Sequence, residues 1–441
     1  MNIATPQPDS DVLIIGGGPA GSTAAILLAR RGLSVTLLER DRHPRFHIGE
    51  SLLPMNMPII ERLGLMPALE RIGLRKPGAD FPADNDRGYS VFRFDRALDP
   101  AWPHAYQVQR AEFDEMLFRH AAATPGVDAH ECATANSIEL GVDGVLARTA
   151  GGAGERVFRA RYLVDASGRD TLLGRQLGLV RRDRRHQSAA LFAHYRGVER
   201  RPGEDAGNVS VYRFAHGWIW LIPLRDGIVS VGAVCSPEHL RERRGRNEAF
   251  LAKTLASVPA LAARMQGATL VGNLHATGNY SYACERIAGP RYVMAGDACA
   301  FVDPIFSSGV YLAMSGAEQA AELVAGALAD PQREAALQRA YTTHVRRGLD
   351  AFSWFIHRFN TDAMRRLFAK PANRWQVEQA VISMLAGDVH ATRVRARLQL
   401  FRAIYYATAL AAWPTAWRDW RRRVRARRGG FVGGTTSQDP A

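Results

Sequence analysis

The chain has 441 residues, is 47% hydrophobic and 23% charged, and carries a formal net charge of +14. This length allows one large domain or two domains that share an extensive core, and the composition excludes a disordered or collagen-like chain. Three lysines stand against 54 arginines. The charge favours acidic partners, but no recognition fold accompanies it, which disfavours nucleic acid.

Cysteine usage and the N-terminus favour a reduced, cytoplasmic compartment. The four cysteines are too few and too widely spaced for a disulfide framework. Residues 1–11 lack the basic and apolar segments of a signal peptide, and no run of about 20 uncharged apolar residues could form a transmembrane segment. No histidine is assigned to a metal, and we expect no metal site.

The first predicted elements are a strand at 12–15, a helix at 22–30 and a second strand at 34–38 that ends at Glu39. The turn before the helix carries the pattern GxGxxG, formed by Gly16, Gly18 and Gly21. In such a unit the glycines let a diphosphate approach the backbone, the helix N-terminus supplies N–H groups, and the acidic residue binds a ribose. The context favours a dinucleotide site over a turn without ligand.

The rest of the chain divides into a β-rich and a helical part. Residues 91–240 alternate turn signals with short β-branched or aromatic runs, and from about 311 onward the spacing is helical, with expected breaks at Pro331, Pro371 and Pro414. The sequence predicts an α/β fold with a Rossmann-type core in residues 1–330, an inserted mostly β substrate region at about 85–110 and 180–285, and a C-terminal helical region at 331–441.

Two further strand ends distinguish FAD from NAD. Residues 162–165 run into the turn Asp165-Ala-Ser-Gly168, and residues 292–295 run into Gly296-Asp297-Ala298. A carboxylate on such a turn can accept hydrogen bonds from a polyol. NAD has no ribityl chain to offer, so the pattern favours FAD.

Four side chains have roles that their local sequence leaves open. Trp218 and Trp220 alternate on a predicted strand, which places both indoles on one face, where such rings usually form core. Lys76 stands in a loop-like segment, yet in a chain so poor in lysine a plain surface charge would more often be arginine. Glu50 is either a contact of the flavin or of the route to Lys76, or a favourable carboxylate at a helix start.

Together these motifs resemble those of the p-hydroxybenzoate hydroxylase-like flavoproteins: GxGxxG with Glu39, Arg110 within Arg-Ala-Glu-Phe-Asp, and the turns at Asp165 and Asp297. The resemblance implies that Glu39 holds the adenosine ribose, Arg110 lies near the diphosphate and Asp297 binds the ribityl chain. The implied FAD-binding set is Gly16, Gly18, Ala20, Gly21, Glu39, Arg45, Arg110, Asp297, Gly309 and Val310.

Within that group the chain is similar to the flavin-dependent halogenases. Residues 218–223, Trp-Ile-Trp-Leu-Ile-Pro, fit the signature WxWxIP, and residues 45–54 and 303–310 resemble the pyrrole and phenol branch. The resemblance implies that Trp218 and Trp220 keep the substrate from the flavin, that Lys76 is catalytic, and that Ser308 and Gly309 bind halide through backbone N–H groups.

Lysine suits this role because a desolvated amine can lose its proton, whereas a guanidinium stays charged. A covalent haloamine and a hypohalous acid hydrogen-bonded to the ammonium both remain open. The implied reaction uses FADH2 from a separate flavin reductase, O2 and halide to make hypohalous acid, which reaches Lys76 and halogenates an electron-rich ring.

The residue at position 306 narrows the expected class of substrate. Free-tryptophan halogenases have a glutamate where this chain has Phe306, so we expect a phenol or a pyrrole, free or on an acyl-carrier protein, in secondary metabolism. The alternatives are a flavin-dependent monooxygenase or other oxidoreductase of the same fold, and a non-catalytic flavoprotein partner in a biosynthetic assembly.

The C-terminus carries a basic tail. Residues 418–428 hold seven arginines and one aspartate, a local charge of +6. Such a block is often only a solvated tail, and its functional interpretations are contact with an acidic carrier protein or with an anionic membrane surface.

Overall fold

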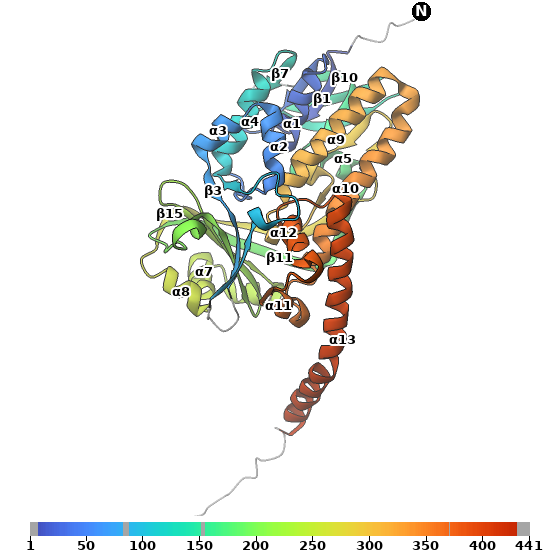
Figure 1. Cartoon of the computed structure of the whole chain (residues 1–441). Helices are drawn as coiled ribbons and strands as arrows, with labels where there is room; N and C mark the ends of the chain where they lie inside the picture. The colour runs from blue at the N-terminus through green and yellow to red at the C-terminus, as the bar shows by residue number, and fades with distance from the viewer. Residues whose placement is uncertain (1–7, 83–87, 151–154, 370, 430–441) are drawn as a thin grey trace, which may run out of the picture.

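The computed structural model describes residues 8–82, 88–150, 155–369 and 371–429. Two large β-sheets dominate it (Figure 1). The first sheet, with helices α1, α9 and α10, forms one part of the molecule, and the second sheet, with α7 and α8, forms the other. This arrangement confirms the predicted α/β class.

The first sheet has the order β16-β17-β10-β1-β2-β7, and the hairpin β8–β9 extends it from β10. β7, β2, β1, β10 and β17 run parallel to one another, whereas β9 and β16 pair antiparallel with β10 and β17. Strand β1 is central and almost entirely buried, which explains its continuous apolar run. The bounds are β1 Ser10–Ile15, β2 Val35–Leu38, β7 Val127–His130, β8 Thr134–Leu140, β9 Val145–Ala150, β10 Arg156–Asp165, β16 Ala288–Gly289 and β17 Tyr292–Met294.

The second sheet has the order β18-β15-β11-β14-β13-β12-β4-β5. Its bounds are β4 Gly78–Pro82, β5 Tyr89–Arg93, β11 Val180–Arg196, β12 Val209–Phe214, β13 Gly217–Pro223, β14 Val229–Cys235, β15 Thr269–Cys284 and β18 Ala300–Phe301. A separate ribbon pairs β3, Leu74–Lys76, with β6, Ala105–Gln107. The strands in these regions lie where the sequence predicts the β substrate region, although its division into domains stays a prediction.

Helices surround both sheets. α1 starts after the glycine turn with Pro19 at its first position, where the missing N–H costs nothing. The helices are α1 Pro19–Ala29, α2 Met57–Leu63, α3 Met66–Ile72, α4 Arg110–Ala122, α5 Leu172–Gln176, α6 Pro237–Leu240, α7 Asn247–Ala256, α8 Pro259–Arg264, α9 Gly309–Ala329, α10 Glu334–Ile356, α11 Asp362–Ala369, α12 Val377–Leu385 and α13 Thr392–Gly429.

The C-terminal helices confirm two of the three expected breaks. α9 ends before Pro331 and α11 ends before Pro371, but α13 continues through Pro414 and extends beyond the two sheets (Figure 1). The break expected at Pro414 is therefore wrong, because a helix can pass through a proline at the cost of the hydrogen bond that the proline cannot donate. The side chains of the basic tail at 418–428 lie outside the described residues.

Phenylalanines join the C-terminal region to the second sheet. The rings of Phe81 of β4 and Phe92 of β5 lie 5.2 and 5.1 Å from the ring of Phe368 of α11. Phe359, just after α10, packs against the same cluster. Helix α11 and the end of α10 therefore cover the β4–β5 edge of the sheet.

The described residues contain no helix that is long and apolar enough to cross a membrane. In the same part of the chain, no group of three or more His, Cys, Asp or Glu side chains is placed to hold a metal ion.

Candidate active site

A cavity of about 450 Å³ runs between the glycine turn and the second sheet. The glycine turn is shaped so that a ligand can come close to its backbone. Gly16 has φ of +98°, and a Cβ there would lie 2.2 Å from the carbonyl oxygen of Ala166. A Cβ at Gly21 would lie 1.8 Å from the carbonyl oxygen of Gly16. Gly16, Gly18 and Ala20 line the cavity, whereas Gly21 serves the packing of α1 onto β1.

The acidic residue at the end of β2 lines the cavity. Glu39 follows β2 and is buried, and its carboxylate accepts the N–H of Gly17 at 2.7 Å and the N–H of Asp41 at 2.9 Å. The Nη2 of Arg45 lies 3.6 Å from Glu39 Oε2. The position at the end of β2, beside the glycine turn, is the one from which an acidic residue can bind a ribose.

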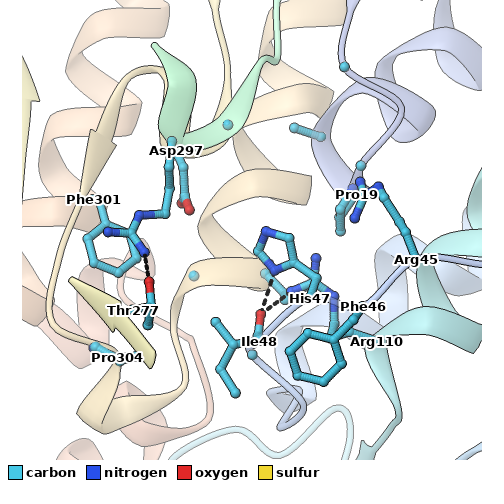
Figure 2. A pocket seen from close by; sticks show the side chains of 18 of the residues that line it. Pro19, Arg45, Phe46, His47, Ile48, Arg110, Thr277, Asp297, Phe301 and Pro304 are labelled. Carbon is cyan, nitrogen blue, oxygen red and sulfur yellow. Dashed lines mark hydrogen bonds between the residues drawn. The ribbon is translucent and has the colours of Figure 1, made fainter. Parts of the chain in front are cut away.

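Arg110 begins α4 and is buried at the wall of the cavity. Its Nε and Nη2 donate to the two carboxylate oxygens of Asp114 at 2.7 and 2.9 Å, and its Nη1 donates to the carbonyl of Ile48 at 2.8 Å. Burial raises the pKa of Asp114, but the charge of Arg110 outweighs it and holds that pKa below its ordinary value. Figure 2 shows Arg110 and Arg45 on the same side of the cavity.

Asp297 lies across the cavity from these arginines (Figure 2). Burial raises its pKa to about 6, and the charges of Arg169 and Arg110 oppose that rise. Arg169 itself donates to Thr277 Oγ1 at 2.7 Å and covers the ring of Phe301. The predicted polyol-binding carboxylate therefore faces the cavity.

Asp165 does not have the polyol-binding role that its turn suggested. Its two oxygens accept the backbone N–H groups of Ser167 at 3.0 Å and Leu173 at 2.9 Å, and it does not line the cavity. The carboxylate is fully buried and holds the turn between β10 and α5. Because this carboxylate is fully buried and does not line the cavity, we assign it a structural role.

The N-terminus of α9 also lines the cavity. Ser307 has φ of +57°, Ser308 is helical, and Ser307, Gly309 and Val310 line the cavity. Ser308 is fully buried, and its Oγ has no hydrogen-bond partner among the described residues. A left-handed residue followed by a helical one turns successive N–H groups to the same side, as in an anion-binding nest.

The two tryptophans lie on β13 and line the cavity. Both are 5% exposed, and their ring centroids are 5.7 Å apart. Trp220 Nε1 donates to Ser230 Oγ at 3.1 Å. The two rings are both buried and part of the cavity wall. This position is compatible with core packing and with the implied role of keeping the substrate from the flavin.

Lys76 ends β3 and is 1% exposed. Its Nζ donates to the carbonyl of Leu52 at 2.9 Å and lies 5.3 Å from the ring centroid of Phe94. Burial lowers its pKa to about 7. Lys76 does not line the cavity, although Ser51, next to Leu52, does. The loop charge that its local sequence suggested is thus a buried amine.

Glu50 corrects another expectation. No helix starts there, because Leu52 N–H donates to the carbonyl of Tyr106 and Val108 N–H donates to the carbonyl of Glu50, which keeps the segment extended. The carboxylate is 1% exposed, lines the cavity and lies 2.8 Å from Nε2 of His194. Burial lowers the pKa of His194, but the hydrogen bond to Glu50 outweighs it and raises that pKa.

Several cavity residues carried no recognised role in the sequence. His47 donates from Nδ1 to the carbonyl of Ile48 at 2.7 Å, and burial lowers its pKa to about 4, so the ring is neutral (Figure 2). Thr277 of β15 lines the cavity, and His194 of β11 contacts the cavity residue Glu50; neither position has a signal in its local sequence. Arg169 directly follows the turn at Asp165 and could have been found from that motif.

The residues present fit FAD. The glycine turn leaves no room for a Cβ at Gly16, and a helix N-terminus faces the cavity. The buried carboxylate of Glu39 and the half-buried carboxylate of Asp297 both line it. A dinucleotide with a ribose and a polyol supplies hydrogen-bond donors to both carboxylates. Fold and site together define an FAD-dependent oxidoreductase.

The comparisons with known proteins support this class and narrow it. Residues 9–351 match the family described as "FAD binding domain". A tryptophan 2-halogenase of Chondromyces crocatus is 36% identical over 76% of this chain and 66% of its own length. A flavin-dependent halogenase of Armillaria mellea is 34% identical over 72% of this chain and 68% of its own. The chain therefore belongs to the flavin-dependent halogenases, as its motifs predict.

More distant relatives cover more of the chain. A 1H-pyrrole-2-carbonyl-[peptidyl-carrier protein] chlorinase of Pseudomonas fluorescens is 28% identical over 90% of this chain and 94% of its own. The flavin-dependent brominase Bmp2 superposes with a TM-score of 0.79 at 28% identity, over 89% of this chain and 99% of its own. A flavoprotein/dehydrogenase from Cytophaga hutchinsonii superposes with a TM-score of 0.81 at 26% identity, over 91% and 99%.

Proposed function

We propose that this protein halogenates a phenolic or pyrrolic ring, using reduced FAD, O2 and chloride or bromide, and that Lys76 delivers the halogen. The observation that carries the proposal is a buried lysine amine beside the FAD cavity. It has a carbonyl as its hydrogen-bond acceptor, and its lowered pKa comes from burial alone. A buried lysine without a carboxylate is costly, and such a cost is typical of a functional amine.

The cofactor and the other site residues have separate proposed roles. FAD, when bound and reduced, supplies two electrons that reduce O2, and the partly reduced oxygen can then oxidise halide. The N–H groups at Ser308 and Gly309 hold the halide, and Trp218 and Trp220 separate the cavity from the substrate. The amine of Lys76 then takes the halogen and passes it to the ring.

The neutral amine is the favoured reactive form. Among the described residues, Nζ donates to the carbonyl of Leu52 and lies near the ring of Phe94, and neither group is an anion that would hold the ammonium. A deprotonated amine can form a haloamine with hypohalous acid. This favours the haloamine over the hydrogen-bonded alternative.

The proposed substrate class depends on Phe306. This side chain is 4% exposed and packs at 5.6 Å against the ring of Phe359, so no carboxylate occupies the position before the α9 turn. The pyrrole-carrier chlorinase among the relatives supports a pyrrole on a carrier protein, and the tryptophan 2-halogenase makes an indole the substrate to compare. A separate flavin reductase is the proposed source of FADH2.

The decisive experiment supplies FADH2, O2 and bromide to the purified protein with a phenol, a pyrrole and an indole, each free and carrier-bound. Mass spectrometry should find brominated phenol or pyrrole. Hydroxylated product would instead support a flavin-dependent monooxygenase of the same fold, the second candidate. FAD binding without turnover of any acceptor would support a partner protein.

We expect the yield of brominated product per FADH2 oxidised to rise about tenfold between pH 6 and pH 8. With a pKa of about 7, Lys76 is mostly protonated at pH 6 and mostly neutral at pH 8. The rate of FADH2 oxidation, measured at each pH, is the control. A yield that falls as the pH rises would assign the reaction to the ammonium form.

The basic tail is the proposed contact for an acidic carrier protein. If it makes this contact, deleting residues 418–428 should weaken carrier binding about tenfold at low salt and reduce its dependence on salt. FAD binding should not change. Carrier binding that is the same in the full chain and the deletion variant at every salt concentration would remove the tail from the interface.

A further inference from the structure

Three short strands meet beside the Lys76 amine. Residues 50–52 pair antiparallel with β6, and β6 pairs antiparallel with β3. Ser51 stands opposite Gln107, as a pair whose flanking residues make the hydrogen bonds. Side chains of such a pair are the closest in an antiparallel sheet and share one face.

Lys76 lies on the same face as Ser51 and Gln107. It stands opposite Ala105, two residues before Gln107, so its side chain is a diagonal neighbour of the glutamine. The small Ala105 lets the lysine cross β6 and reach the carbonyl of Leu52 on the third strand. The amine therefore ends one residue from Ser51.

Two buried oxygens on this face have no hydrogen-bond partner among the described residues. They are Ser51 Oγ and Gln107 Oε1, and the two residues are 4% and 0% exposed. The glutamine amide is held in place because its Nε2 donates to the carbonyl of Gly207 at 3.1 Å. Gly207 is itself tightly packed, since a Cβ there would lie 1.9 Å from the carbonyl oxygen of Arg75.

A buried unpaired oxygen is costly, so two together point to a small polar molecule that binds between them. Their positions indicate its route. Ser51 also lines the FAD cavity, whereas Gln107 and Lys76 do not. The two oxygens thus lead from the cavity to the amine.

We propose that Ser51 and Gln107 are positioning residues that carry hypohalous acid from the FAD cavity to Lys76. Ser51 receives the acid at the cavity wall, and Gln107 Oε1 accepts its O–H and turns the halogen toward Nζ. The nitrogen lone pair then forms the N–halogen bond as the halogen–oxygen bond breaks. The leaving hydroxide takes a proton from the amine, which gives one haloamine and one water. This inference rests on the proposed function of Lys76.

The test compares Gln107→Met, which keeps the volume but removes the oxygen, with the control Gln109→Met, two residues along the chain. Each variant receives FADH2, O2 and bromide, and three quantities are measured: FADH2 oxidation, brominated substrate and free hypobromous acid captured by a soluble scavenger. For Gln107→Met we expect unchanged FADH2 oxidation, at least tenfold less product and a matching rise in captured hypobromous acid. Equal product and equal captured acid in Gln107→Met and wild type would overturn the inference.

A second pair isolates the serine hydroxyl if Gln107→Met fails to fold. Ser51→Thr and Ser51→Val add the same volume, but only threonine keeps a hydroxyl. The ratio of product to captured acid should stay near the wild-type value in Ser51→Thr and fall several-fold in Ser51→Val. Equal ratios in the two variants would overturn the role of Ser51. A wild-type protein that brominates nothing would overturn the proposed function and this inference together.

Discussion

Replacing Lys76 with methionine should lower the yield of halogenated product by about 100-fold or more, while FADH2 oxidation stays within about twofold of wild type. The amine is the group that takes the halogen in the proposed reaction, and FADH2 oxidation takes place in a cavity that Lys76 does not line. Methionine suits the site because Lys76 is 1% exposed and its pKa is lowered by burial, so an uncharged side chain of similar length should be tolerated.

The controls for Lys76 separate charge from chemistry. Lys76→Arg keeps a cation but cannot become a neutral amine, and it should be as inactive as Lys76→Met. The other two lysines, Lys253 and Lys370, provide Lys253→Met as a matched control, since Lys253 is exposed and pairs with Glu242. Halogenated product at the wild-type level from Lys76→Met would contradict the assigned role of Lys76, whatever the rate of FADH2 oxidation.

Gly21→Ala should weaken FAD binding by at least about 100-fold. An added Cβ would lie 1.8 Å from the carbonyl oxygen of Gly16, which is backbone and cannot rotate away. The contact must shift α1 from β1 and distort the glycine turn, at a cost of about 3 kcal/mol or more, equivalent to roughly two factors of ten in affinity. Titration of FAD against the apoprotein, followed by flavin fluorescence, measures the change.

The control for Gly21 is Gly141→Ala, in the hairpin between β8 and β9. A Cβ there would meet the carbonyl oxygen of Gly144 at 3.4 Å, an ordinary contact, so FAD binding and the melting temperature should stay close to wild type. If Gly21→Ala bound FAD as tightly as wild type, the turn would not be held in the shape that the structure describes.

Much of the fold and the FAD site could be predicted because their signals are local. The glycine turn, Glu39 and the Gly-Asp turn at Asp297 each depend on a few consecutive residues, and parallel strands bring their carboxyl ends to one edge. The structure places all three around one cavity. The same local logic also suggested Asp165, but the sequence does not reveal that this carboxylate is buried away from the cavity, where it accepts two backbone N–H groups.

The features of the fold and the site that the sequence did not predict depend mainly on contacts between distant segments. The burial of Lys76 follows from pairing with β6 and from the carbonyl of Leu52, neither of which has a signal near residue 76. The pair Glu50–His194 joins residues 144 positions apart. Helix α13 passes through Pro414 because one lost hydrogen bond is small beside the rest of a 38-residue helix. Local secondary-structure propensity does not include these contributions to the free energy of folding.

The burial of Lys76 also has a consequence for stoichiometry. With Lys76 1% exposed, the described conformation offers an aromatic ring no open approach to the amine from solvent, and the proposed route admits only the small hypohalous acid. A haloamine formed in this state would persist until the side chains that cover Lys76 move. Each chain would then store one oxidising equivalent and no more, and quenching the protein after FADH2 oxidation without acceptor should release at most one halogen per chain.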